Sequence, residues 1–470
     1  MIVEASPTRT RNRGNGRAKP RLERTIFETS RLLEYFTDRE LRYQTGRAPS
    51  EWPIVIVKEL VDNALDACED AGIAPEITVA VECDDREGRI TAMDNGPGIA
   101  PETLARILDF SVRVSDKEAY VSPTRGAQGN ALKTVIAIPY VASTTDPKVG
   151  QVIITSRGVR HNLTIATDLL RQEPRIQHTQ AEETSPVTSV SVALDYRGIL
   201  SGADPGVFYK WLRGYSLFNP HATFRLETPE GIETWAPRCP GWVKWTPSDP
   251  TSPWWYTDDD LGRLIAAHVV HAENGGRDLP TRELVAQFRG LSSTIKQKRI
   301  TSQLSQRHLS EFMRDGDLDG EAVAAFLVAL RAEAKPVKPD HLGLLGEAAI
   351  RDCMEVWYEL TPDCFRYMCL KGYEGDLPYI LEVALARKAH PPLDQYLGLN
   401  CAPTYGDPFA ELRLQHDSKR AVFAGTGLNA LLSEFKVQST DPLVLVVHLA
   451  FPRPRFRDRG KTGLQLEGTR

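Results

Sequence analysis

The sequence contains no run of 18 consecutive apolar residues, so it has no segment of the length and apolar character that a membrane-crossing helix needs. Residues 1–20 contain no apolar stretch of the kind found in secretory signals, and we therefore expect a cytoplasmic protein. Cysteine is scarce, at 7 of 470 residues, and no two cysteines form a CxxC pair. We therefore expect neither a disulfide scaffold nor a zinc site.

Charge is distributed unevenly along a chain whose composition, 41% hydrophobic and 25% charged, is ordinary for a globular protein. The net charge is −5, yet residues 1–24 carry seven Lys or Arg against Glu4 and Glu23, which leaves −10 for the remainder. This basic tail has too few apolar residues to pack a core, so we expect it to be disordered. It is either a solvated tail or a segment that contacts nucleic-acid phosphates.

The length of 470 residues and the hydrophobic pattern predict two or three domains of mixed α and β structure. Residues 233–257 hold five of the eight tryptophans and five prolines, which is typical of a packed linker. Residues 258–335 are expected to be mostly helical, and we place domain borders near residues 245 and 336. Helices are predicted over 27–45, over 54–71 and from 131, and strands over 77–83, 89–95, 151–158, 189–196, 377–386 and 443–452.

The first motif lies in the predicted helix KELVDNALDA, where Glu59, Asn63 and Asp66 are expected to share one helical face. A carboxamide oxygen suits a hard cation such as Mg²⁺, and a carboxylate one turn away can orient and deprotonate a water molecule. The simpler alternative is an amphipathic helix with a solvated polar face.

The second motif, DNGPGI, follows a predicted strand and begins with Asp94. Gly96 and Gly98 around a proline indicate a rigid turn where backbone can approach a ligand closely. Asp94 at the strand end can accept a hydrogen bond from an exocyclic amine such as that of adenine, and Ile99 closes the motif. The alternative is a plain Asp-Gly turn.

The third motif is a glycine-containing loop that leads into a helix. The free N–H groups at the start of that helix favour a polyphosphate, and a lysine one turn inside would add a point charge. The alternative is a flexible linker before a capped helix. The motif comprises Thr124, Arg125, Gly126, Ala127, Gln128, Gly129, Asn130, Ala131, Leu132 and Lys133.

The order and spacing of these three motifs resemble those of the GHKL ATPases. The resemblance implies an α+β fold with the GHKL (Bergerat) ATPase sandwich, and ATP and Mg²⁺ as cofactors. It assigns the catalytic base to Glu59, the Mg²⁺ ligand to Asn63 and the adenine contact to Asp94, with Asp66 in the same nucleotide site. The loop Gly126–Lys133 would close over the phosphates. A Walker A loop is excluded, because GKT at 460–462 would need glycine where Arg455 stands.

The remaining segments resemble the B subunits of topoisomerase VI along nearly the whole chain. FETSRLLEYF (27–36) is similar to the N-terminal strap, and LVAQFRGLSSTIKQKR (284–299) to the helix-two-turn-helix insert. GLNCAPTYGDP (398–408) and VVHLAFPRPRFRDRGKTGL (446–464) resemble the transducer, whose switch lysine would be Lys461. The resemblance implies a basic tail at 1–24, an ATPase domain at 25–245, a linker and helical domain at 246–335, and an α/β transducer-like domain at 336–470.

This resemblance implies a homodimer that forms on ATP binding, acts on duplex DNA and works with a separate DNA-cleaving subunit. Candidate phosphate contacts, or alternatively parts of solvated charged faces, are Lys296, Lys298, Arg299, Arg453 and Arg455. Two departures stand out: Ala131 occupies a position where the family usually has glycine, and the chain ends nine residues after Lys461, without the expected stalk helix. The main alternative function is a stand-alone GHKL ATPase clamp without topoisomerase activity. A histidine kinase is disfavoured because residues 1–58 contain no histidine.

Overall fold

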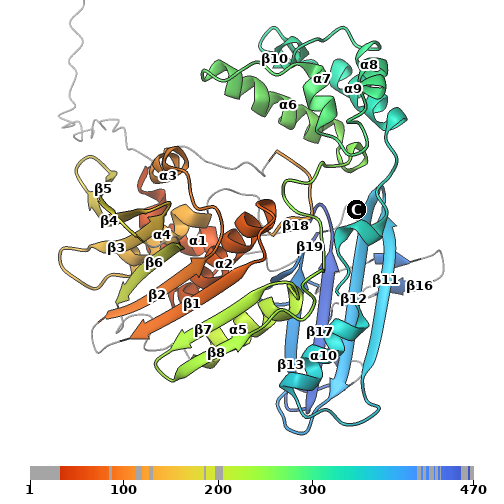
Figure 1. Cartoon of the computed structure of the whole chain (residues 1–470). Coiled ribbons are helices and arrows are strands. Elements are labelled where there is room, and N and C mark those ends of the chain that lie inside the picture. Colours follow the sequence, from red (N-terminus) through yellow and green to blue (C-terminus); the bar gives the residue numbers. More distant parts are fainter. Residues whose placement is uncertain are drawn as a thin grey trace, which may run out of the picture.

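The structure is a computed structural model, and it shows three bodies that follow one another along the chain (Figure 1). The first body is a sheet with helices. A helical unit follows it in the chain and lies above it in this view. The last of the three contains another sheet and is called the second body below. The structure describes residues 32–83, 87–111, 119–125, 131–184, 187–195, 205–409, 414–416, 420–422, 428, 432–433, 436–456 and 464–465.

The first body combines short and long helices with the larger of the two main sheets. Its helices are η1 (Leu32–Phe36), α1 (Asp38–Thr45), η2 (Pro49–Glu51), α2 (Trp52–Asp70), α3 (Pro101–Leu108), α4 (Ala131–Ala142) and α5 (Pro205–Phe218). Its strands are β1 (Glu76–Cys83), β2 (Glu87–Asp94), β3 (Gly150–Ser156), β4 (Val159–Asp168), β5 (Glu173–Glu182), β6 (Thr188–Asp195), β7 (Thr223–Thr228) and β8 (Gly231–Trp235).

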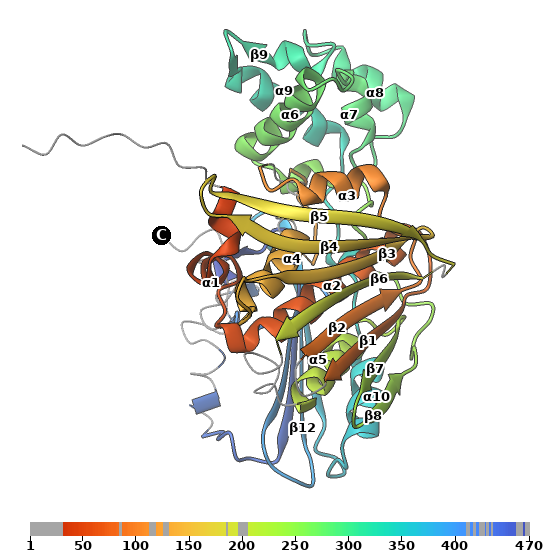
Figure 2. The same cartoon turned by 90° about the vertical axis from the view of Figure 1, so that its left-hand side faces the viewer.

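The first sheet runs in the order β5-β4-β3-β6-β2-β1-β7-β8. Only β1 and β7 pair in parallel, and the other neighbouring strands are antiparallel. Figure 2 shows α2, α4 and α5 together on one face of this sheet. Alternating burial along β4 fits a sheet with one packed face, because successive side chains of a strand point to opposite faces.

Helix α2 confirms the strongest of the predicted helices, with a start at Trp52 and an end at Asp70. Pro53 stands in its first turn, where the missing N–H costs nothing. Its apolar side chains are buried against the sheet. Before its last two residues, the positions of α2 that are not buried form one stripe, Glu59, Asn63 and Ala67. The predicted strands at 77–83, 89–95, 151–158 and 189–196 are confirmed as β1, β2, β3 and β6.

The single helix predicted over 27–45 is wrong in its described part, since a 3₁₀ helix and α1 replace it. Thr37 between them has extended backbone angles (φ −123°, ψ 147°), and its hydroxyl accepts a hydrogen bond from the Glu40 N–H. A threonine that caps the N-terminus of a new helix ends the preceding one. Residues 27–31 lie outside the described residues.

The helical unit confirms the helical prediction for 258–335, with one short strand pair added. It comprises η4 (Pro253–Trp255), α6 (Asp258–Glu273), α7 (Thr281–Ala286), α8 (Thr294–Thr301), η5 (Leu309–Phe312), β9 (Met313–Arg314), β10 (Asp317–Leu318) and α9 (Gly320–Glu333). Trp245 of the linker packs against Trp255, with ring centroids 4.8 Å apart, and both are buried. The tryptophan-rich linker is therefore part of a core, as its composition predicts.

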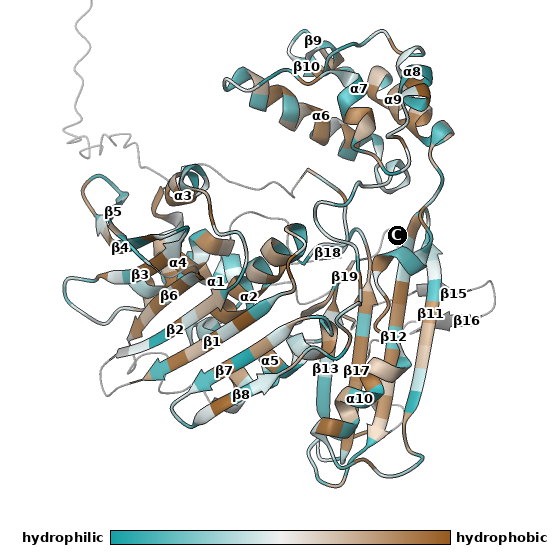
Figure 3. Cartoon of the chain, in the orientation of Figure 1, coloured by the Kyte–Doolittle hydropathy of each residue, from teal (hydrophilic) through white to brown (hydrophobic). Residues whose placement is uncertain are grey.

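The second body is built on a sheet of order β11-β12-β17-β13-β14, in which β13 and β17 are parallel. Apolar residues run along its central strands β12 and β17 (Figure 3), and Phe218 at the end of α5 packs into its core with helix α10. Its elements are η6 (Pro339–Leu342), α10 (Glu347–Trp357), β11 (Arg366–Glu374), β12 (Leu377–Arg387), β13 (Asp394–Leu399), β14 (Ala402–Pro403), β15 (Leu414–His416), β16 (Arg420–Val422), β17 (Leu443–Ala450), β18 (Arg455–Phe456) and β19 (Leu464–Gln465).

The overall class is α+β, as expected, and β12 and β17 confirm the strands predicted at 377–386 and 443–452. The domain borders near 245 and 336 stay predictions. Within the described residues, no helix is both long and apolar enough to cross a membrane.

Candidate functional site

Two of the three predicted polar residues of α2 lie on its open stripe. Asn63 is exposed and Glu59 is half-buried, and within the described residues neither side chain forms a hydrogen bond or an ion pair. Both are therefore open to a ligand. Asp66 was expected on the same face, but it is buried and its carboxylate accepts a hydrogen bond from Arg125 at 2.5 Å. Seven residues bring Asp66 back to within about 20° of Glu59 around the helix axis. The helix itself therefore leaves Asp66 near the stripe, and its burial goes with its bond to Arg125.

The DNGPGI turn places Asp94 at the end of β2, next to α2. The Gly96 N–H donates to Oδ1 of Asp94 at 2.8 Å, and burial raises the pKa of this carboxyl to about 6. A Cβ on Gly96 would lie 2.8 Å from that oxygen and 3.6 Å from Cβ of Ala67. The turn therefore touches α2 at Ala67, the residue that continues the Glu59–Asn63 stripe by one more helical turn.

Gly98 has a left-handed backbone (φ 76°) and sits against the β3–β4 turn. A Cβ at this position would meet Oγ of Ser156 at 2.7 Å and Oγ1 of Thr188 at 3.2 Å. Ser156 accepts a hydrogen bond from the Ile99 N–H at 2.8 Å and donates to the Ile99 carbonyl at 3.2 Å. Glycine is required here by both conformation and space.

Thr188 is a candidate site residue that the sequence analysis missed. It is buried at the start of β6, directly opposite Asp94 in the antiparallel register. The carboxylate of Asp94 and the hydroxyl of Thr188 therefore stand side by side at one end of the sheet, where they offer an acceptor and a donor. Only the strand register reveals this pair, because the two residues are far apart in sequence.

The glycine loop is described only at its two ends, because Gly126, Ala127, Gln128, Gly129 and Asn130 lie outside the described residues. Ala131 and Leu132 begin α4 and are half-buried. Lys133 is buried, donates to the Asp109 carbonyl and lies 5.6 Å from the Phe110 ring, and burial lowers its pKa. Lys133 is therefore engaged within the protein instead of presenting the free charge expected for a phosphate contact.

Arg125 forms the centre of a buried ionic cluster instead of facing a ligand. Its guanidinium bonds Asp66 at 2.5 Å, both oxygens of Glu69 at 2.8 and 2.7 Å, and Oδ1 of Asn219 at 2.6 Å. Lys244 adds a second cation 2.7 Å from Glu69. Burial alone would raise the pKa of Glu69, but the charges of Arg125 and Lys244 outweigh it and hold that pKa well below its usual range. We therefore leave Asp66 and Arg125 out of the nucleotide site.

The basic residues predicted to contact DNA differ in their availability. Lys296 donates to the carbonyls of Gly290 and Glu333, both at 2.9 Å, and Arg299 pairs with the Glu333 carboxylate at 2.8 Å. Arg453 pairs with Asp260 at 2.7 Å. Lys298 is exposed and has no such partner among the described residues. The side chain of Arg455 is outside the described part.

Lys461, the expected switch lysine, belongs to residues 457–463, which the structure does not describe. The strands on either side of that segment, β18 and β19, pair with each other, with Arg455 opposite Gln465. Leu464 of β19 is buried, and its N–H donates to the Pro408 carbonyl at 2.9 Å. Both ends of the segment are therefore attached to the second body.

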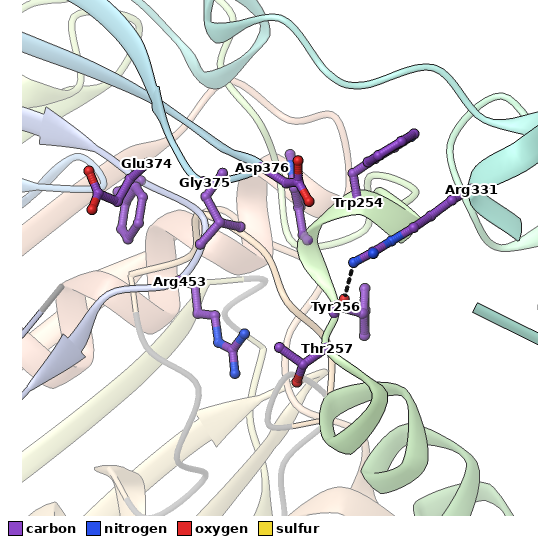
Figure 4. A pocket seen from close by; sticks show the side chains of 11 residues that line it. Trp254, Tyr256, Thr257, Arg331, Glu374, Gly375, Asp376 and Arg453 are labelled. Atoms are coloured by element: carbon purple, nitrogen blue, oxygen red, sulfur yellow. Dashed lines mark hydrogen bonds between the residues drawn. The ribbon is translucent and has the colours of Figure 1, made fainter. Parts of the chain in front are cut away.

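A cavity of about 160 Å³ lies between the helical unit and the second body, away from the motif residues (Figure 4). Both arginines that line it have partners within the protein: Arg331 donates to the Tyr256 carbonyl at 2.7 Å, and Arg453 pairs with Asp260. We interpret this cavity as a seam between packed bodies rather than as a ligand site.

The donor set on α2 fits one hard cation held together with a ligand. Asn63 offers an exposed amide oxygen and Glu59 a carboxylate four residues earlier, both of which are oxygen donors that Mg²⁺ accepts. Within the described residues, no group of three or more His, Cys, Asp or Glu side chains converges as a metal cage. This pattern agrees with Mg²⁺ binding through one or two protein groups plus substrate phosphates.

Comparison with known proteins adds a family match. Residues 50–157 match the model of the histidine kinase-, DNA gyrase B- and HSP90-like ATPases, a range that includes Glu59, Asn63 and Asp94. The chain is 30% identical to the B subunit of type 2 DNA topoisomerase 6 from Archaeoglobus fulgidus over 184 residues, which cover 39% of this chain and 30% of that relative. That match therefore represents less than a third of the relative's length.

Two further similarities extend over more of the chain. The corresponding B protein of type 2 DNA topoisomerase 6 from Saccharolobus shibatae is 25% identical over 420 residues, which cover 87% of this chain and 74% of that protein. The crystal structure of the B-subunit of DNA gyrase from Myxococcus xanthus aligns with 93% of this chain and 89% of its own, at 10% identity and a TM-score of 0.37.

Proposed function

We propose that this chain binds and hydrolyses ATP with Mg²⁺. The premise is that residues 50–157 carry an ATPase domain of the histidine kinase, gyrase B and HSP90 family. The observation that supports it best is the open stripe of Glu59, Asn63 and Ala67, which ends at the Asp94–Gly98 turn. Glu59 and Asn63, which have no polar partner among the described residues, are thereby joined to a turn at which Asp94 offers a carboxylate.

In this proposal, the stripe of Glu59, Asn63 and Ala67 sets the orientation of the bound nucleotide. Adenine would lie at Asp94 and Thr188, where a carboxylate and a hydroxyl stand side by side at the sheet end. The phosphates would run back along α2 toward Asn63 and then Glu59. Eight residues of α-helix span about 12 Å, so the two ends of the nucleotide would fall on separate groups.

The chemistry follows from the two side chains at the phosphate end. Asn63 would hold Mg²⁺, which neutralises phosphate charge when bound. Glu59 would accept a proton from the water that attacks the terminal phosphate, a task for a carboxylate that is not already paired. Glu59 fits this role because, within the described residues, no cation neutralises it.

Titration calorimetry with ADP tests the nucleotide site. We expect the wild-type chain to bind ADP more tightly with Mg²⁺ than without it, and we expect Asn63→Ala to remove most of this difference. A wild-type chain that binds neither ADP nor ATP in the presence of Mg²⁺ would contradict the proposal.

We further propose that this ATPase is a topoisomerase-VI-B-like protein that dimerises with ATP, acts on duplex DNA in the cytoplasm and relies on a separate cleaving subunit. The similarity over 87% of the chain to the Saccharolobus protein supports this proposal. The alternative is a stand-alone clamp that binds DNA without topoisomerase activity. DNA relaxation assayed with and without a cleaving subunit discriminates the two: relaxation only in the reconstituted pair supports the first, and ATP-dependent DNA retention without relaxation supports the second.

A further inference from the structure

A largely buried ring of hydrogen bonds joins the first body to the sheet of the second body at a single tight turn. The turn consists of Asn400 and Cys401, which connect β13 to β14, with Leu399 paired to Ala402. Both turn residues have positive φ, 48° and 64°, as a two-residue type I′ hairpin requires. Asparagine tolerates this conformation well, and cysteine does not favour it, so the surroundings must hold the turn in place.

The ring closes through three side chains. Arg125 donates to Oδ1 of Asn219 at 2.6 Å, and Nδ2 of Asn219 donates to the Cys401 carbonyl at 2.9 Å. Nδ2 of Asn400 in turn donates to the Thr124 carbonyl at 3.2 Å. Thr124 and Arg125 are neighbours in the chain, so the ring returns to its start. Asn219 and the Arg125 side chain are fully buried, which protects the bonds that Asn219 forms with Arg125 and Cys401 from water.

Asn400 also binds the end of β17 with the same side chain. Its Nδ2 donates to the Phe451 carbonyl at 3.0 Å, and its Oδ1 accepts from the Phe451 N–H at 2.8 Å. One amide group therefore connects Thr124, directly before the glycine loop, with Phe451, from which the chain continues toward β18 and Lys461. These two segments are more than 300 residues apart in sequence.

We propose that Asn400 is a positioning residue that fixes the segment at Thr124–Arg125 and the end of β17 relative to each other. Through Asn400, nucleotide binding in the first body changes the backbone hydrogen bonding at Phe451. This inference rests on the proposed function, because it names how the nucleotide site is coupled to the second body. Arg125 makes the coupling stiff, since its bonds to Asp66 and Glu69 anchor the same segment to α2.

Three variants of the full chain separate the bonds of Asn400. Asn400→Gly keeps the positive φ and removes every side-chain bond. Asn400→Asp keeps an acceptor for the Phe451 N–H but loses the donor to the Thr124 and Phe451 carbonyls. Tyr373→Phe is the matched control. It removes one hydrogen bond in the second body, from the hydroxyl of this β11 residue to the Val337 carbonyl at 3.3 Å, and no hydrogen bond links Tyr373 to either segment among the described residues.

Hydrogen exchange of the nucleotide-free chain tests directly whether Asn400 connects the two segments. In Asn400→Gly we expect two sets of amides to exchange about tenfold faster than in the wild type, an effect the size of one lost hydrogen bond. They are the amides of Ser122, Thr124 and Arg125 in the first segment and of Ala450, Phe451 and Arg453 in the second. Asn400→Asp should accelerate exchange at Ser122, Thr124 and Arg125 while the Phe451 amide stays protected, and Tyr373→Phe should change neither segment. Unchanged exchange at residues 122–125 in both Asn400 variants would overturn the inference.

Hydrogen exchange in the presence of nucleotide then tests whether the connection through Asn400 transmits nucleotide binding to Phe451. With a non-hydrolysable ATP analogue and Mg²⁺, exchange at residues 450–453 should change in the wild type and not in Asn400→Gly, whose ATP turnover should fall at least fivefold while its nucleotide affinity stays within twofold. An equal nucleotide effect at residues 450–453 in both proteins would overturn the inference. Absence of nucleotide binding by the wild type would instead contradict the proposed ATPase, and the nucleotide-free exchange would still decide whether Asn400 joins the two segments.

Discussion

At the scale of single residues, comparing alanine substitutions at Gly98 and Gly72 distinguishes backbone strain from a steric clash. Gly98→Ala combines a left-handed φ with a Cβ 2.7 Å from Oγ of Ser156, and we expect it to lower the free energy of unfolding by about 3 kcal/mol. Gly72→Ala is the matched control, with φ 67° and no heavy atom within 4 Å of the new Cβ, and should cost only about 1 kcal/mol. Urea unfolding measures both changes, and equal costs would refute the steric account.

Asp94 makes a prediction about pH. Burial raises its pKa from 3.8 to about 6, so the folded chain holds a proton that the unfolded chain releases, and the contribution of Asp94 to stability declines as pH rises from about 4 to about 6. The ionised form is the acceptor for adenine, so ADP should bind about tenfold more weakly at pH 5 than at pH 7.

Calorimetry across this pH range checks the prediction, with Asp94→Asn as the control. The variant keeps an oxygen for the Gly96 N–H but has no titrating group, so its ADP affinity should lose most of the pH dependence. The same pH slope in both proteins would show that Asp94 does not contact the base.

At the scale of elements, the cluster around Arg125 ties the segment at 124–125 to α2. Arg125→Met would leave the carboxylates of Asp66 and Glu69 buried with too few partners, and we expect it to lower the free energy of unfolding by about 3–5 kcal/mol. Arg277→Met removes an exposed pair with Glu283 and should leave the urea midpoint nearly unchanged. A small effect of Arg125→Met would mean that the cluster does not hold these elements together.

The elements also show what the sequence can predict and where it stops. Helix α2 and strands β1, β2 and β3 follow from local hydrophobic periodicity, because each packs a regular apolar face. The break at Thr37 was missed because a capping threonine inside an apolar pattern resembles an ordinary polar position of one longer helix. Local pattern therefore predicts where elements form more reliably than where one ends and the next begins.

Long-range pairing explains why some predicted site residues have surroundings that the sequence did not indicate. Arg125 stands in a glycine loop and resembles a phosphate contact, but its partners Glu69 and Asn219 are 56 and 94 residues away and cannot be inferred from spacing. The contacts of Asp66 with Arg125 and of Lys133 with the Asp109 carbonyl could not be inferred from the sequence for the same reason. The motifs alone predicted that Glu59, Asn63 and Asp94 belong together, and their catalytic roles stay predictions.

At the scale of the whole molecule, the structure narrows the DNA prediction to few side chains. Lys296, Arg299 and Arg453 are held by internal partners, so Lys298 is the best candidate for a phosphate contact in the helical unit. We expect Lys298→Ala to weaken duplex binding a few-fold at low salt and to lower the slope of log affinity against log salt by about one.

Lys210→Ala, which removes an exposed lysine from α5 of the first body, serves as the control for that measurement. Fluorescence anisotropy with a labelled duplex over a series of salt concentrations gives both slopes. Identical slopes for Lys298→Ala and the wild type would exclude Lys298 as a phosphate contact.

The central claim is that α2 carries an ATPase centre in which Glu59 activates water. Single-turnover hydrolysis of ATP by the wild type and by Glu59→Gln, with nucleotide affinity measured on the same samples, tests this claim most directly. We predict that Glu59→Gln binds ATP with Mg²⁺ as tightly as the wild type and hydrolyses it at least about a hundredfold more slowly. Hydrolysis by Glu59→Gln within twofold of the wild-type rate would contradict the account.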